Sequence, residues 1–560
     1  MEMDAVQQPA TTSQIPAGAW WQRGVVYEIY PRSFQDADGD GVGDLAGVVE
    51  RLDYLVELGV DALWLTPIFC SPMVDFGYDI SHYTDIDPLF GDLAGFDRLI
   101  EEAHRRGLKV ILDYVLNHTS DRHPWFEESR ASTDNGRRDW YIWRDAAPDG
   151  GPPNNWRSEF GGSAWTRDEV TGQYYYHAFL AEQPDLNWRN PDVVRAMLAV
   201  LEFWLERGVD GFRVDAIHHL YESESFADNP INPDWEAGTP PAYQLLRVNT
   251  VDLPEVHEAI AAIRRLADRY ADRVLIGEAY LPIERLVTYY GGALDGFHLP
   301  FNFHLISTPW TSQAIANLVS DYEAKLPEGG WPNWVLGNHD RSRVASRIGP
   351  TQIRVAATLL LTLRGTPTLY QGDELGLGDV EIPPDQVKDP FEINVPGMGL
   401  GRDPVRSPMP WSAAPHAGFS DGEPWLPLGA DWRSDNVAAQ TADPDSTLSF
   451  YRRVLRLRRE EPCLHSGAYK RYAVTHSIFA FERSMEGDRL LVILDIGGEG
   501  GAIPVPPSEV VLSTSAEPRA GQALEAGVVQ IRPNEALVLR IDRGAAQEEP
   551  DPPSAISKLD

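Results

Sequence analysis

The sequence predicts an α/β fold in which eight β-α units form a barrel, with a domain inserted after the third strand and a C-terminal antiparallel β-sandwich. Between residues 24 and 460, short apolar runs alternate with amphipathic segments, a pattern typical of parallel strands covered on both faces. From residue 469 onward, β-rich runs are separated by turns, which predicts antiparallel strands. With 560 residues, 43% of them hydrophobic, the chain is long enough for one large domain and smaller ones.

The eight units can be followed in order along the chain. Strands are predicted at residues 24–30, 61–65, 109–114, 210–215, 273–278, 296–301, 332–337 and 366–370. Helices are predicted at residues 45–58, 94–106, 192–207, 254–270, 283–290, 311–326, 351–363 and 446–460. Eight alternating units of this kind predict a (β/α)8 TIM barrel.

The regular alternation breaks in two places, and these breaks give the expected domain boundaries. Residues 118–188 are polar, aromatic and rich in Pro and Gly, which predicts an inserted domain between barrel segments 19–117 and 189–465. Runs such as 477–482, 490–495 and 536–541 predict the C-terminal β-sandwich at 466–543. The tails at 1–18 and 544–560 are expected to be disordered, because they are polar or rich in Pro, Glu and Ala.

Composition excludes several classes of partner and compartment. The formal net charge of −36 repels phosphate groups, so we expect neither nucleic acid nor an anionic membrane as a partner. Only Cys70 and Cys463 are present, which excludes a disulfide framework and fits a reducing compartment. The first 18 residues lack the basic and apolar regions of a secretion signal, and no apolar run approaches a membrane span. We therefore expect a cytoplasmic monomer or small homo-oligomer.

Polar and charged residues follow four of the predicted barrel strands. His118 follows the third strand, Asp215 ends the fourth, Glu278 ends the fifth, and His339 and Asp340 follow the seventh. In a barrel of this kind, residues at the carboxyl ends of the strands meet at one mouth and serve catalysis. Converging carboxylates without a cysteine or a phosphate-binding loop favour glycoside hydrolysis.

A divalent metal site is the main alternative for these carboxylates. Arg213 argues against it, because a guanidinium group beside the cation would be repelled. Arg213 precedes Asp215 by two residues and therefore lies on the same face of the strand. We expect it to keep the Asp215 carboxylate ionised and oriented, whereas Glu278 must stay protonated near neutral pH, helped by neighbouring carboxylates and exclusion of water.

The strand-end segments, in this order, resemble those of the α-amylase superfamily, glycoside hydrolase family 13. Further motifs are similar to its α-glucosidase and oligo-1,6-glucosidase branch: VYEIYPRSF at 26–34, DFGYD at 75–79, QPDLN at 183–187, and GRD followed by RSPMPW within 401–411. The resemblance covers the chain from about residue 20 to residue 541. It implies that Asp215 is the nucleophile, that Glu278 is the general acid and base, and that Asp340 holds the 2- and 3-hydroxyls of the sugar.

The same resemblance implies a pocket for one terminal sugar. His118 and His339 match the histidines that hydrogen-bond this sugar in subsite −1, and Tyr78 matches the aromatic residue that stacks beneath it. Asp75 and Arg402 match a pair that holds its 4- and 6-hydroxyl end, which implies exo-acting cleavage. Phe160, Phe179 and Gln183 of the inserted domain match positions in the wall of the same pocket.

A second motif consists of acidic residues at alternate positions of a glycine-rich loop after the first strand. It looks like the first half of an EF-hand loop, but its twelfth position is Gly47, so the bidentate glutamate is missing. It resembles instead the metal loop of the α-glucosidase branch, which implies a structural Ca²⁺ or Mg²⁺ ion. The alternative is a solvated Asp/Gly turn. The implied ligands are Asp36, Asp38, Asp40, the carbonyl of Val42, and Asp44.

Ala216 bears on which bond is cut. In the family branch a small residue here accompanies α-1,4 preference and valine accompanies α-1,6 preference, so we expect cleavage of short α-1,4-linked glucosides such as maltose. The Pro-rich segment 221–249 is expected to cap the +1 side of the pocket, with a flexible linker as its alternative.

Other reactions of the same family stay open at this point. Transglucosylation, isomerisation of sucrose or trehalose, and α-1,6 preference are the enzymatic alternatives. The segment FHLPFNF at 297–303 lacks the Arg-Leu-Asp-Arg-Asp type of motif associated with sucrose isomerases, which disfavours that reaction. A non-enzymatic interaction ectodomain is disfavoured by the presence of Asp215, Glu278 and Asp340 and by the absence of a membrane-spanning run in the sequence.

Overall fold

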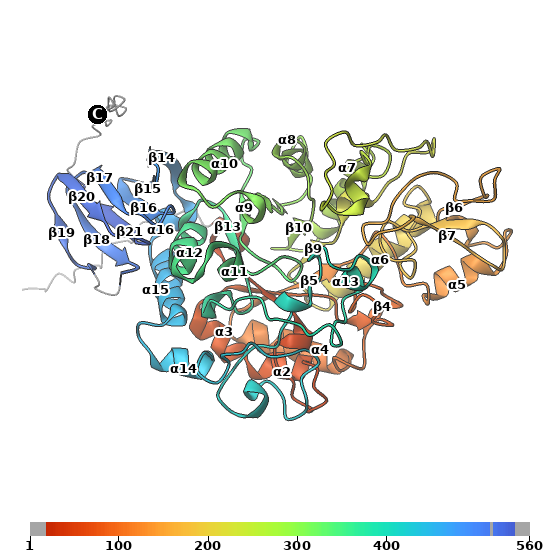
Figure 1. Cartoon of the computed structure of the whole chain (residues 1–560), viewed down its shortest axis with the longest axis horizontal. Helices are drawn as coiled ribbons and strands as arrows, with labels where there is room; N and C mark the ends of the chain where they lie inside the picture. The colour runs from red at the N-terminus through yellow and green to blue at the C-terminus, as the bar shows by residue number, and fades with distance from the viewer. Residues whose placement is uncertain (1–17, 516–518, 544–560) are drawn as a thin grey trace, which may run out of the picture.

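The computed structural model describes residues 18–515 and 519–543, and it confirms the predicted fold class. A central barrel lies between the inserted segment on one side and a C-terminal β domain on the other (Figure 1). The predictions for the two tails lie outside the described residues, apart from residue 18. Among the described residues, no helix has the length and apolar character needed to cross a membrane.

Eight parallel strands form the central sheet, and each agrees with a predicted strand. They are β1 (Val26–Ile29), β2 (Ala62–Leu65), β5 (Lys109–Tyr114), β9 (Gly211–Val214), β10 (Val274–Gly277), β11 (Leu299–Pro300), β12 (Asn333–Val335) and β13 (Thr366–Tyr370). The strand order is β11-β10-β9-β5-β2-β1-β13-β12. The two end strands, β11 and β12, place Leu299 and Val335 in one apolar cluster, which closes the barrel interior.

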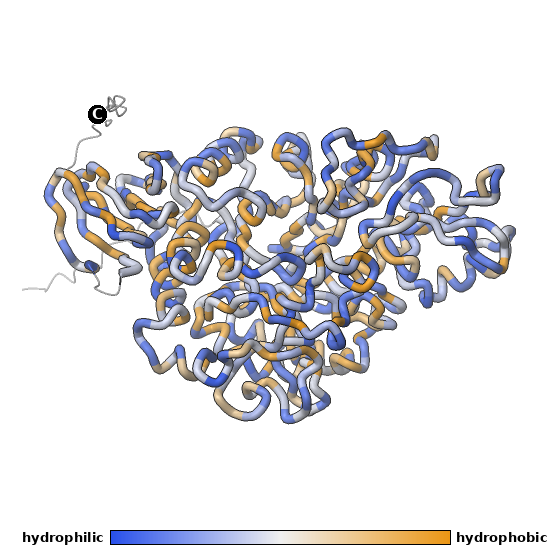
Figure 2. The backbone as a smooth tube through the Cα atoms, in the orientation of Figure 1, coloured by the Kyte–Doolittle hydropathy of each residue, from blue (hydrophilic) through white to orange (hydrophobic). Residues whose placement is uncertain are grey.

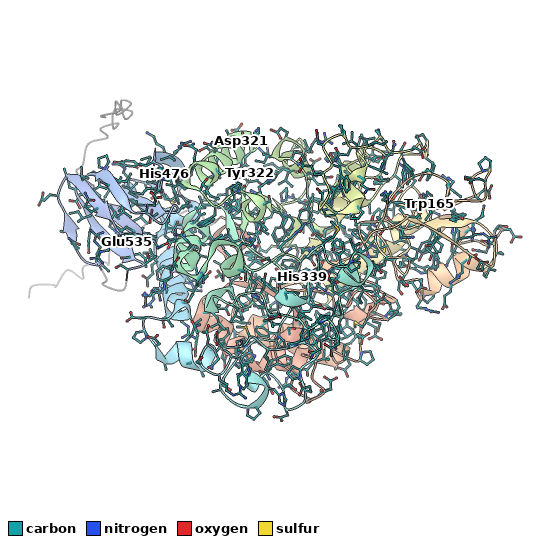
Figure 3. The ribbon with its side chains drawn as sticks, viewed as in Figure 1. Trp165, Asp321, Tyr322, His339, His476 and Glu535 are labelled. Atoms are coloured by element: carbon teal, nitrogen blue, oxygen red, sulfur yellow. The ribbon has the colours of Figure 1, made fainter. Side chains whose placement is uncertain are left out.

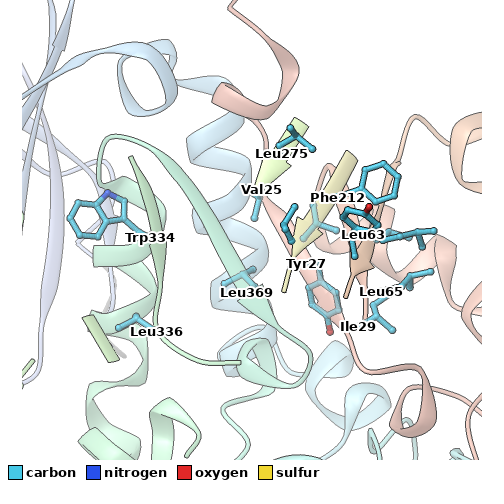
Figure 4. Packing of buried hydrophobic residues seen from close by; sticks show 14 of the residues in the cluster. Val25, Tyr27, Ile29, Leu63, Leu65, Phe212, Leu275, Trp334, Leu336 and Leu369 are labelled. Atoms are coloured by element: carbon cyan, nitrogen blue, oxygen red, sulfur yellow. The ribbon is translucent and has the colours of Figure 1, made fainter. Parts of the chain in front are cut away.

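Side chains of the barrel strands alternate between the interior and the surrounding helices. Val26 of β1 joins the interior cluster, whereas Tyr27 and Ile29 pack outward with the helices (Figure 4). The alternation follows from the two-residue period of a β-strand. On β9 it turns Phe212 outward into the helical layer. Arg213, one residue later, therefore belongs to the inner face, and it is 1% exposed.

Helices surround the barrel strands where the sequence predicts them, with two changes. The segment 45–58 divides at Arg51, whose N–H bonds back to Val48 and Val49, and the segment 283–290 tightens from α to 3-10 geometry after Leu286. The helices of the barrel layer are α2 (Leu45–Glu50), α3 (Leu52–Leu58), α4 (Leu93–Arg105), α6 (Pro191–Glu206), α7 (Val256–Ala267), α8 (Ile283–Leu286), η5 (Val287–Tyr290), α10 (Ser312–Lys325), α12 (Ile353–Thr362) and α15 (Thr447–Glu460).

Shorter elements occupy the loops between these units. The strands β3 (Phe69–Cys70) and β4 (His82–Ile86) form a small antiparallel pair. The short helices are α1 (Trp20–Arg23), η1 (Pro31–Ser33), η3 (Ile217–His219), η4 (Pro241–Gln244), α9 (His304–Ser307), α11 (Val344–Ile348), η6 (Pro350–Gln352), η7 (Asp373–Leu375), α13 (Pro390–Asn394), η8 (Asp403–Val405), η9 (Pro415–Gly418), α14 (Val437–Ala442) and α16 (Pro462–Ser466).

The inserted segment after β5 packs against the loop that follows β9. It contains α5 (Pro124–Ala131), η2 (Arg138–Trp140), and an antiparallel sheet of β6 (Trp143–Arg144), β7 (Trp165–Arg167) and β8 (Tyr174–Tyr176). Trp156 stacks on Phe226 and donates from Nε1 to the carbonyl of Ala227. The side chain of Asn155 donates to the carbonyl of Asn229 at 2.9 Å. The Pro-rich 221–249 segment is therefore held against the inserted segment by stacking and hydrogen bonds, and it is not a free linker.

The C-terminal domain has two antiparallel sheets with an apolar layer between them. The larger sheet contains β14 (Ala468–Val474), β15 (Ile478–Met485), β16 (Asp488–Asp495), β18 (Ser508–Ser513), β19 (Ala523–Leu524) and β21 (Ala536–Ile541), and the smaller sheet pairs β17 (Gly501–Val505) with β20 (Gly527–Ile531). Ile493 and Leu537 of the larger sheet pack with Ile503 and Val529 of the smaller. Hydrophobic segments follow these strands in Figure 2.

Candidate active site

A cavity of about 950 Å³ lies at the carboxyl ends of the barrel strands. It is lined by every predicted catalytic and substrate-binding residue except Arg213 and His339: Asp75, Tyr78, His118, Phe160, Phe179, Gln183, Asp215, Ala216, Glu278, Asp340 and Arg402. Arg213 and His339 are fully buried against this group. Figure 3 shows His339 near the middle of the molecule, between the C-terminal domain and Trp165 of the inserted segment.

Arg213 binds three carboxyl groups at the bottom of the cavity. Its Nη1 lies 2.7 Å from Oδ1 of Asp113 and 2.6 Å from Oδ1 of Asp215, and its Nη2 lies 2.6 Å from Oε2 of Glu278. The two terminal nitrogens of a guanidinium group are neighbours in one planar fork. Contact with both nitrogens therefore brings Asp215 and Glu278 together, as a retaining pair requires.

The two carboxyl groups have different affinities for protons. Burial raises the pKa of Glu278 to about 8; the charge of Arg213 opposes the rise, and the charges of Asp215 and Asp340 add to it. Burial also raises the pKa of Asp215 to about 7, although Arg213 lowers it. Arg213 thus makes the predicted contact with Asp215. Desolvation, however, raises the pKa of Asp215 by more than Arg213 lowers it. The contact with Glu278 lowers the pKa of Asp215, whereas the charge of Asp215 raises the pKa of Glu278, so a proton on the pair favours Glu278. This is the order of ionisation that a nucleophile and a general acid need.

Asp340 is held in its ionised form by its neighbours. Burial opposes ionisation, but the guanidinium groups of Arg402 and Arg406 hold the pKa of Asp340 below its usual range. Arg406 Nη2 donates to Oδ1 of Asp340 at 2.9 Å. His339 Nε2 lies 3.3 Å from Oδ2 of Asp340 and 2.8 Å from the hydroxyl oxygen of Tyr78. A carboxylate that stays ionised in this position can accept hydrogen bonds from sugar hydroxyls.

An ion pair joins two parts of the pocket lining that are distant in the sequence. Arg402 Nη2 contacts Oδ1 of Asp75 at 2.7 Å, although the two residues are 327 positions apart, and it also binds Asp389 at 2.6 Å. Gln183 donates to Oδ2 of Asp75 at 3.1 Å and lies 3.2 Å from Nε2 of His118. The side chains predicted to hold one terminal sugar are therefore joined in one hydrogen-bonded group.

Aromatic rings form the remaining wall. The rings of Tyr78 and His339 are stacked with centroids 5.5 Å apart, and the ring of Phe179 lies 5.3 Å from that of His118. Phe160 contacts Phe179 and lies under the guanidinium of Arg402, 5.1 Å from ring centroid to Cζ. Apolar ring faces of this kind pack against the C–H faces of a sugar and exclude water.

Ala216 adopts a backbone conformation that sequence reasoning does not reveal. Its φ of 43° and ψ of 32° lie in the left-handed region, which is unfavourable for side chains with a Cβ and most unfavourable for β-branched ones. This conformation lets the Ala216 N–H donate to Oε2 of Glu278 at 2.9 Å. The residue after Asp215 therefore binds Glu278 through its backbone.

Several functional residues were not singled out from the sequence. Asp113 and Glu28 lie inside apolar strand segments, where a charged residue on the inner face was the available signal. Arg406 stands within the RSPMPW motif, but its contact with Asp340 has no local signal in the sequence. Asp389 comes from an irregular loop and binds Arg402, and no pattern in the sequence indicates this contact.

The acidic loop after β1 brings three of the predicted carboxylate ligands together. Carboxylate oxygens of Asp36, Asp38 and Asp40 lie within 4.8 Å of one another. Burial raises the pKa of Asp40, and the neighbouring carboxylates, Asp38 first among them, add to the effect. Both oxygens of Asp44 accept backbone N–H groups, one of them at the start of α2. The cluster fits a hard cation, which would relieve the repulsion among these carboxylates.

A TIM barrel with two carboxyl groups bridged by one guanidinium in a cavity at its mouth fits a glycoside hydrolase. The chain belongs to the α-amylase family, since the family model described as "Alpha amylase, catalytic domain" matches residues 28–467.

Known proteins similar to the chain agree with this family over most of its length. A probable alpha-glucosidase of Rhizobium meliloti (strain 1021) is 42% identical over 515 residues, which covers 89% of this chain and 93% of that protein. An oligo-1,6-glucosidase of Parageobacillus thermoglucosidasius is 36% identical over 564 residues, covering 93% and 99% of the two chains. The solved structure of the alpha-glucosyl transfer enzyme XgtA has a TM-score of 0.89 and 40% identity, and the match covers 94% of this chain and all of that one.

The order of ionisation predicts a bell-shaped pH dependence. Activity should fall below about pH 7, where Asp215 takes up a proton, and above about pH 8, where Glu278 loses its proton. The measurement is kcat/KM for an α-glucoside from pH 5 to 10. With an aryl α-glucoside whose phenol leaves without protonation, the Glu278→Gln variant should lose the alkaline limb. If kcat/KM of this variant still falls near pH 8, the alkaline limb comes from the deprotonation of another group and not of Glu278.

Proposed function

We propose that the protein is a retaining, exo-acting α-glucosidase that releases α-glucose from the non-reducing ends of short α-1,4-linked glucosides such as maltose. The observation that carries this proposal is the contact of one guanidinium group, that of Arg213, with both Asp215 and Glu278. This arrangement places the two carboxyl groups close together and separates their roles by their order of ionisation. Retaining hydrolysis requires a close pair of this kind, with one group as nucleophile and the other as acid.

The reaction proceeds in two displacements. In the first, an oxygen of ionised Asp215 forms a bond to the anomeric carbon while the glycosidic bond breaks, and Glu278 gives its proton to the leaving oxygen. In the second, Glu278 removes a proton from water, whose oxygen displaces Asp215 and restores the α-configuration. Asp340, ionised and fixed by Arg406, accepts hydrogen bonds from sugar hydroxyls as positive charge develops on the ring.

Exo-acting cleavage is supported by the closed end of the pocket. The ion pair of Asp75 with Arg402 joins two distant loops beyond Tyr78. A longer chain would have to break this pair and leave a buried charge without its partner, which is costly. With this ion pair intact, the pocket has room for one terminal sugar. The 4- and 6-hydroxyl groups of that sugar can form hydrogen bonds to Asp75 and Arg402.

The preference for an α-1,4 bond is supported by Ala216, whose side chain lines the cavity beside Glu278. The preference for short substrates is supported by the anchored loop at 221–249, from which Tyr243 and Arg247 reach the cavity. Arg247 forms an ion pair with Glu159 of the inserted segment, so the two walls meet on this side. Transfer of glucose to a second sugar is the alternative reaction, since the similar structure XgtA is described as an alpha-glucosyl transfer enzyme.

We further propose that the acidic loop holds a structural Ca²⁺ or Mg²⁺ ion. Asp36, Asp38 and Asp40 would supply carboxylate oxygens, together with the carbonyl of Val42, and the part played by Asp44 stays a prediction. The loop is fixed to a distant segment, because the hydroxyl of Ser420 donates to Asp36. An ion here would join the first β-α loop to that segment and stabilise the fold without taking part in the chemistry.

We propose a cytoplasmic location for the protein, in which small α-glucosides are its partners and it acts as a monomer or small homo-oligomer. Cys70 and Cys463 are both free thiols, which supports a reducing compartment. The net charge of −36 supports a protein that does not bind nucleic acid or anionic membranes.

The nucleophile can be tested by substitution and rescue. Asp215→Ala should lower the release of phenol from an aryl α-glucoside by at least about 10⁴-fold, because the covalent intermediate cannot form. Added azide should restore activity by entering the vacated space, and the product should be the β-glucosyl azide. Near-wild-type activity without azide would disprove the mechanism. Product analysis of the wild type on maltose, isomaltose, sucrose and trehalose tests the linkage and the acceptor.

The effect of residue 216 on linkage can be tested with two variants. Ala216→Val should raise the ratio of isomaltose to maltose hydrolysis, and it should lower both rates because a β-branched residue is strained at a φ of 43°. Ala216→Gly removes the strain without adding bulk. Its ratio of isomaltose to maltose hydrolysis should therefore be lower than the ratio of the Ala216→Val variant. The measurement is kcat/KM for both disaccharides. An unchanged ratio in the valine variant would remove residue 216 as a determinant of linkage.

The proposed ion can be tested by its effect on stability. Removal of divalent ions with a chelator should lower the free energy of unfolding by about 3 kcal/mol, if the ion is present at 100 times its Kd, with little change in the initial rate. Asp38→Asn should show the lower thermal midpoint even without chelator. The opposite result, loss of rate at an unchanged thermal midpoint, would place an ion in the chemistry instead.

A further inference from the structure

Glu28 is a buried carboxyl group for which the proposed reaction gives no role. It lies on the inner face of β1 and is 0% exposed. Its Oε1 lies 2.5 Å from Nδ1 of His339 and 3.3 Å from the backbone nitrogen of the same residue. Within the described part of the chain, Oε2 has no hydrogen-bond partner, and no arginine or lysine forms an ion pair with Glu28. A carboxylate in this position would be a buried charge without a cation in contact, which is unfavourable.

The other ring nitrogen of His339 indicates where its proton lies. Nε2 faces Oδ2 of Asp340 at 3.3 Å and the hydroxyl oxygen of Tyr78 at 2.8 Å. Asp340 is ionised and can only accept hydrogen bonds. The Tyr78 hydroxyl lies 3.0 Å from Oδ2 of Asp113, to which it donates its single hydrogen. Both oxygens near Nε2 are therefore acceptors toward it, so the ring carries a proton on Nε2.

His339 carries only one ring proton. Burial lowers the pKa of His339 well below its usual value, and Arg406, Arg213 and Arg402 act in the same direction against the opposing effect of Asp340. With the proton on Nε2, Nδ1 is a bare acceptor. The short contact between Nδ1 and Oε1 of Glu28 must then be made by a proton that belongs to Glu28.

We propose that Glu28 is a positioning residue that acts as a neutral carboxylic acid. Its O–H donates to Nδ1 of His339 and holds the imidazole in the tautomer that presents Nε2–H to Asp340 and to the sugar. This inference rests on the proposed function for the role of the sugar, but the protonation pattern itself does not require a substrate.

The electrostatic surroundings of Glu28 agree with a neutral group. Burial raises the pKa of Glu28 well above its usual value. The charge of Arg213, which makes no contact, and the backbone N–H of His339 oppose the rise, whereas Asp340 and Asp113 add to it. If Glu28 were ionised, it would accept the ring proton on Nδ1 and leave the Nε2 lone pair facing the Asp340 carboxylate. That arrangement is repulsive and removes a donor from the sugar site.

Neutron diffraction of the deuterated, substrate-free protein tests the protonation pattern directly. We expect deuterium on Oε1 of Glu28 and on Nε2 of His339, with none on Nδ1. Deuterium on Nδ1 would overturn the proposal. Because this measurement uses no substrate, it can fail while the protein is still an α-glucosidase, and it can succeed if the proposed substrate is wrong.

Two variants test whether the donor matters for catalysis. Glu28→Gln keeps an N–H donor toward Nδ1 and should retain kcat/KM for maltose within about threefold. Glu28→Met has a similar length without a donor and should lower kcat/KM by about 10- to 100-fold, by analogy with the loss seen when a hydrogen-bond partner of a metal-bound histidine is removed. If the glutamine variant is as impaired as the methionine variant, or if neither is impaired, the donor has no role.

A double-mutant cycle separates positioning from general loss of structure. In a His339→Ala background, Glu28→Met should change kcat/KM by less than about threefold, since the group through which Glu28 acts is gone. An equal loss in both backgrounds would show that Glu28 supports the barrel rather than His339. Thermal midpoints of all variants are compared, and the neutron measurement on the wild type decides the question if Glu28→Met does not fold.

Discussion

One buried guanidinium group determines how the centre of the barrel is arranged. Arg213 contacts carboxyl groups from three adjacent strands, so its charge offsets the carboxylates of Asp113 and Asp215 while it also holds the carboxyl group of Glu278. Strand register makes this geometry available, because Arg213 lies opposite Asp113 on β5 and opposite Ile276 on β10. Burial of a cation and of each carboxylate is unfavourable when they are separate. Together they form an interior in which two catalytic groups can differ in acidity while they remain in contact with one cation.

The pocket is assembled from loops that are far apart in the chain and that depend on one another. Asp75 follows the second barrel strand and Arg402 follows the eighth, yet they form one ion pair. Elsewhere in the lining of the same cavity, Glu159 of the inserted segment pairs with Arg247 of the loop after β9. The barrel provides the chemistry, and contacts between loops provide the shape. A change in one loop therefore alters the pocket through a partner in another.

The sequence allowed the fold class and the position of the catalytic carboxylates to be predicted, because both depend on local patterns. Asp215 and Glu278 stand where apolar strands end, and that position places them at the barrel mouth independently of the conformation of the loops. The contacts of Asp389 with Arg402 and of Asp44 with the start of α2 depend on the path of irregular backbone, which hydrophobic periodicity does not describe. The left-handed conformation of Ala216 was missed for a similar reason, since alanine is not a residue that signals positive φ.

Ala216 affects both the acidity of Glu278 and the shape of the pocket, so one substitution at this position changes the two together. Its backbone N–H lowers the pKa of Glu278, and the residue lines the cavity at the carboxyl ends of the barrel strands. A substitution that reshapes the pocket also shifts the backbone that holds the general acid. The effect of a mutation at residue 216 should therefore depend on which residues already tune Glu278, a form of epistasis. Changes of linkage preference within such a lineage would then be reached through compensating substitutions near the acid, rather than through residue 216 alone.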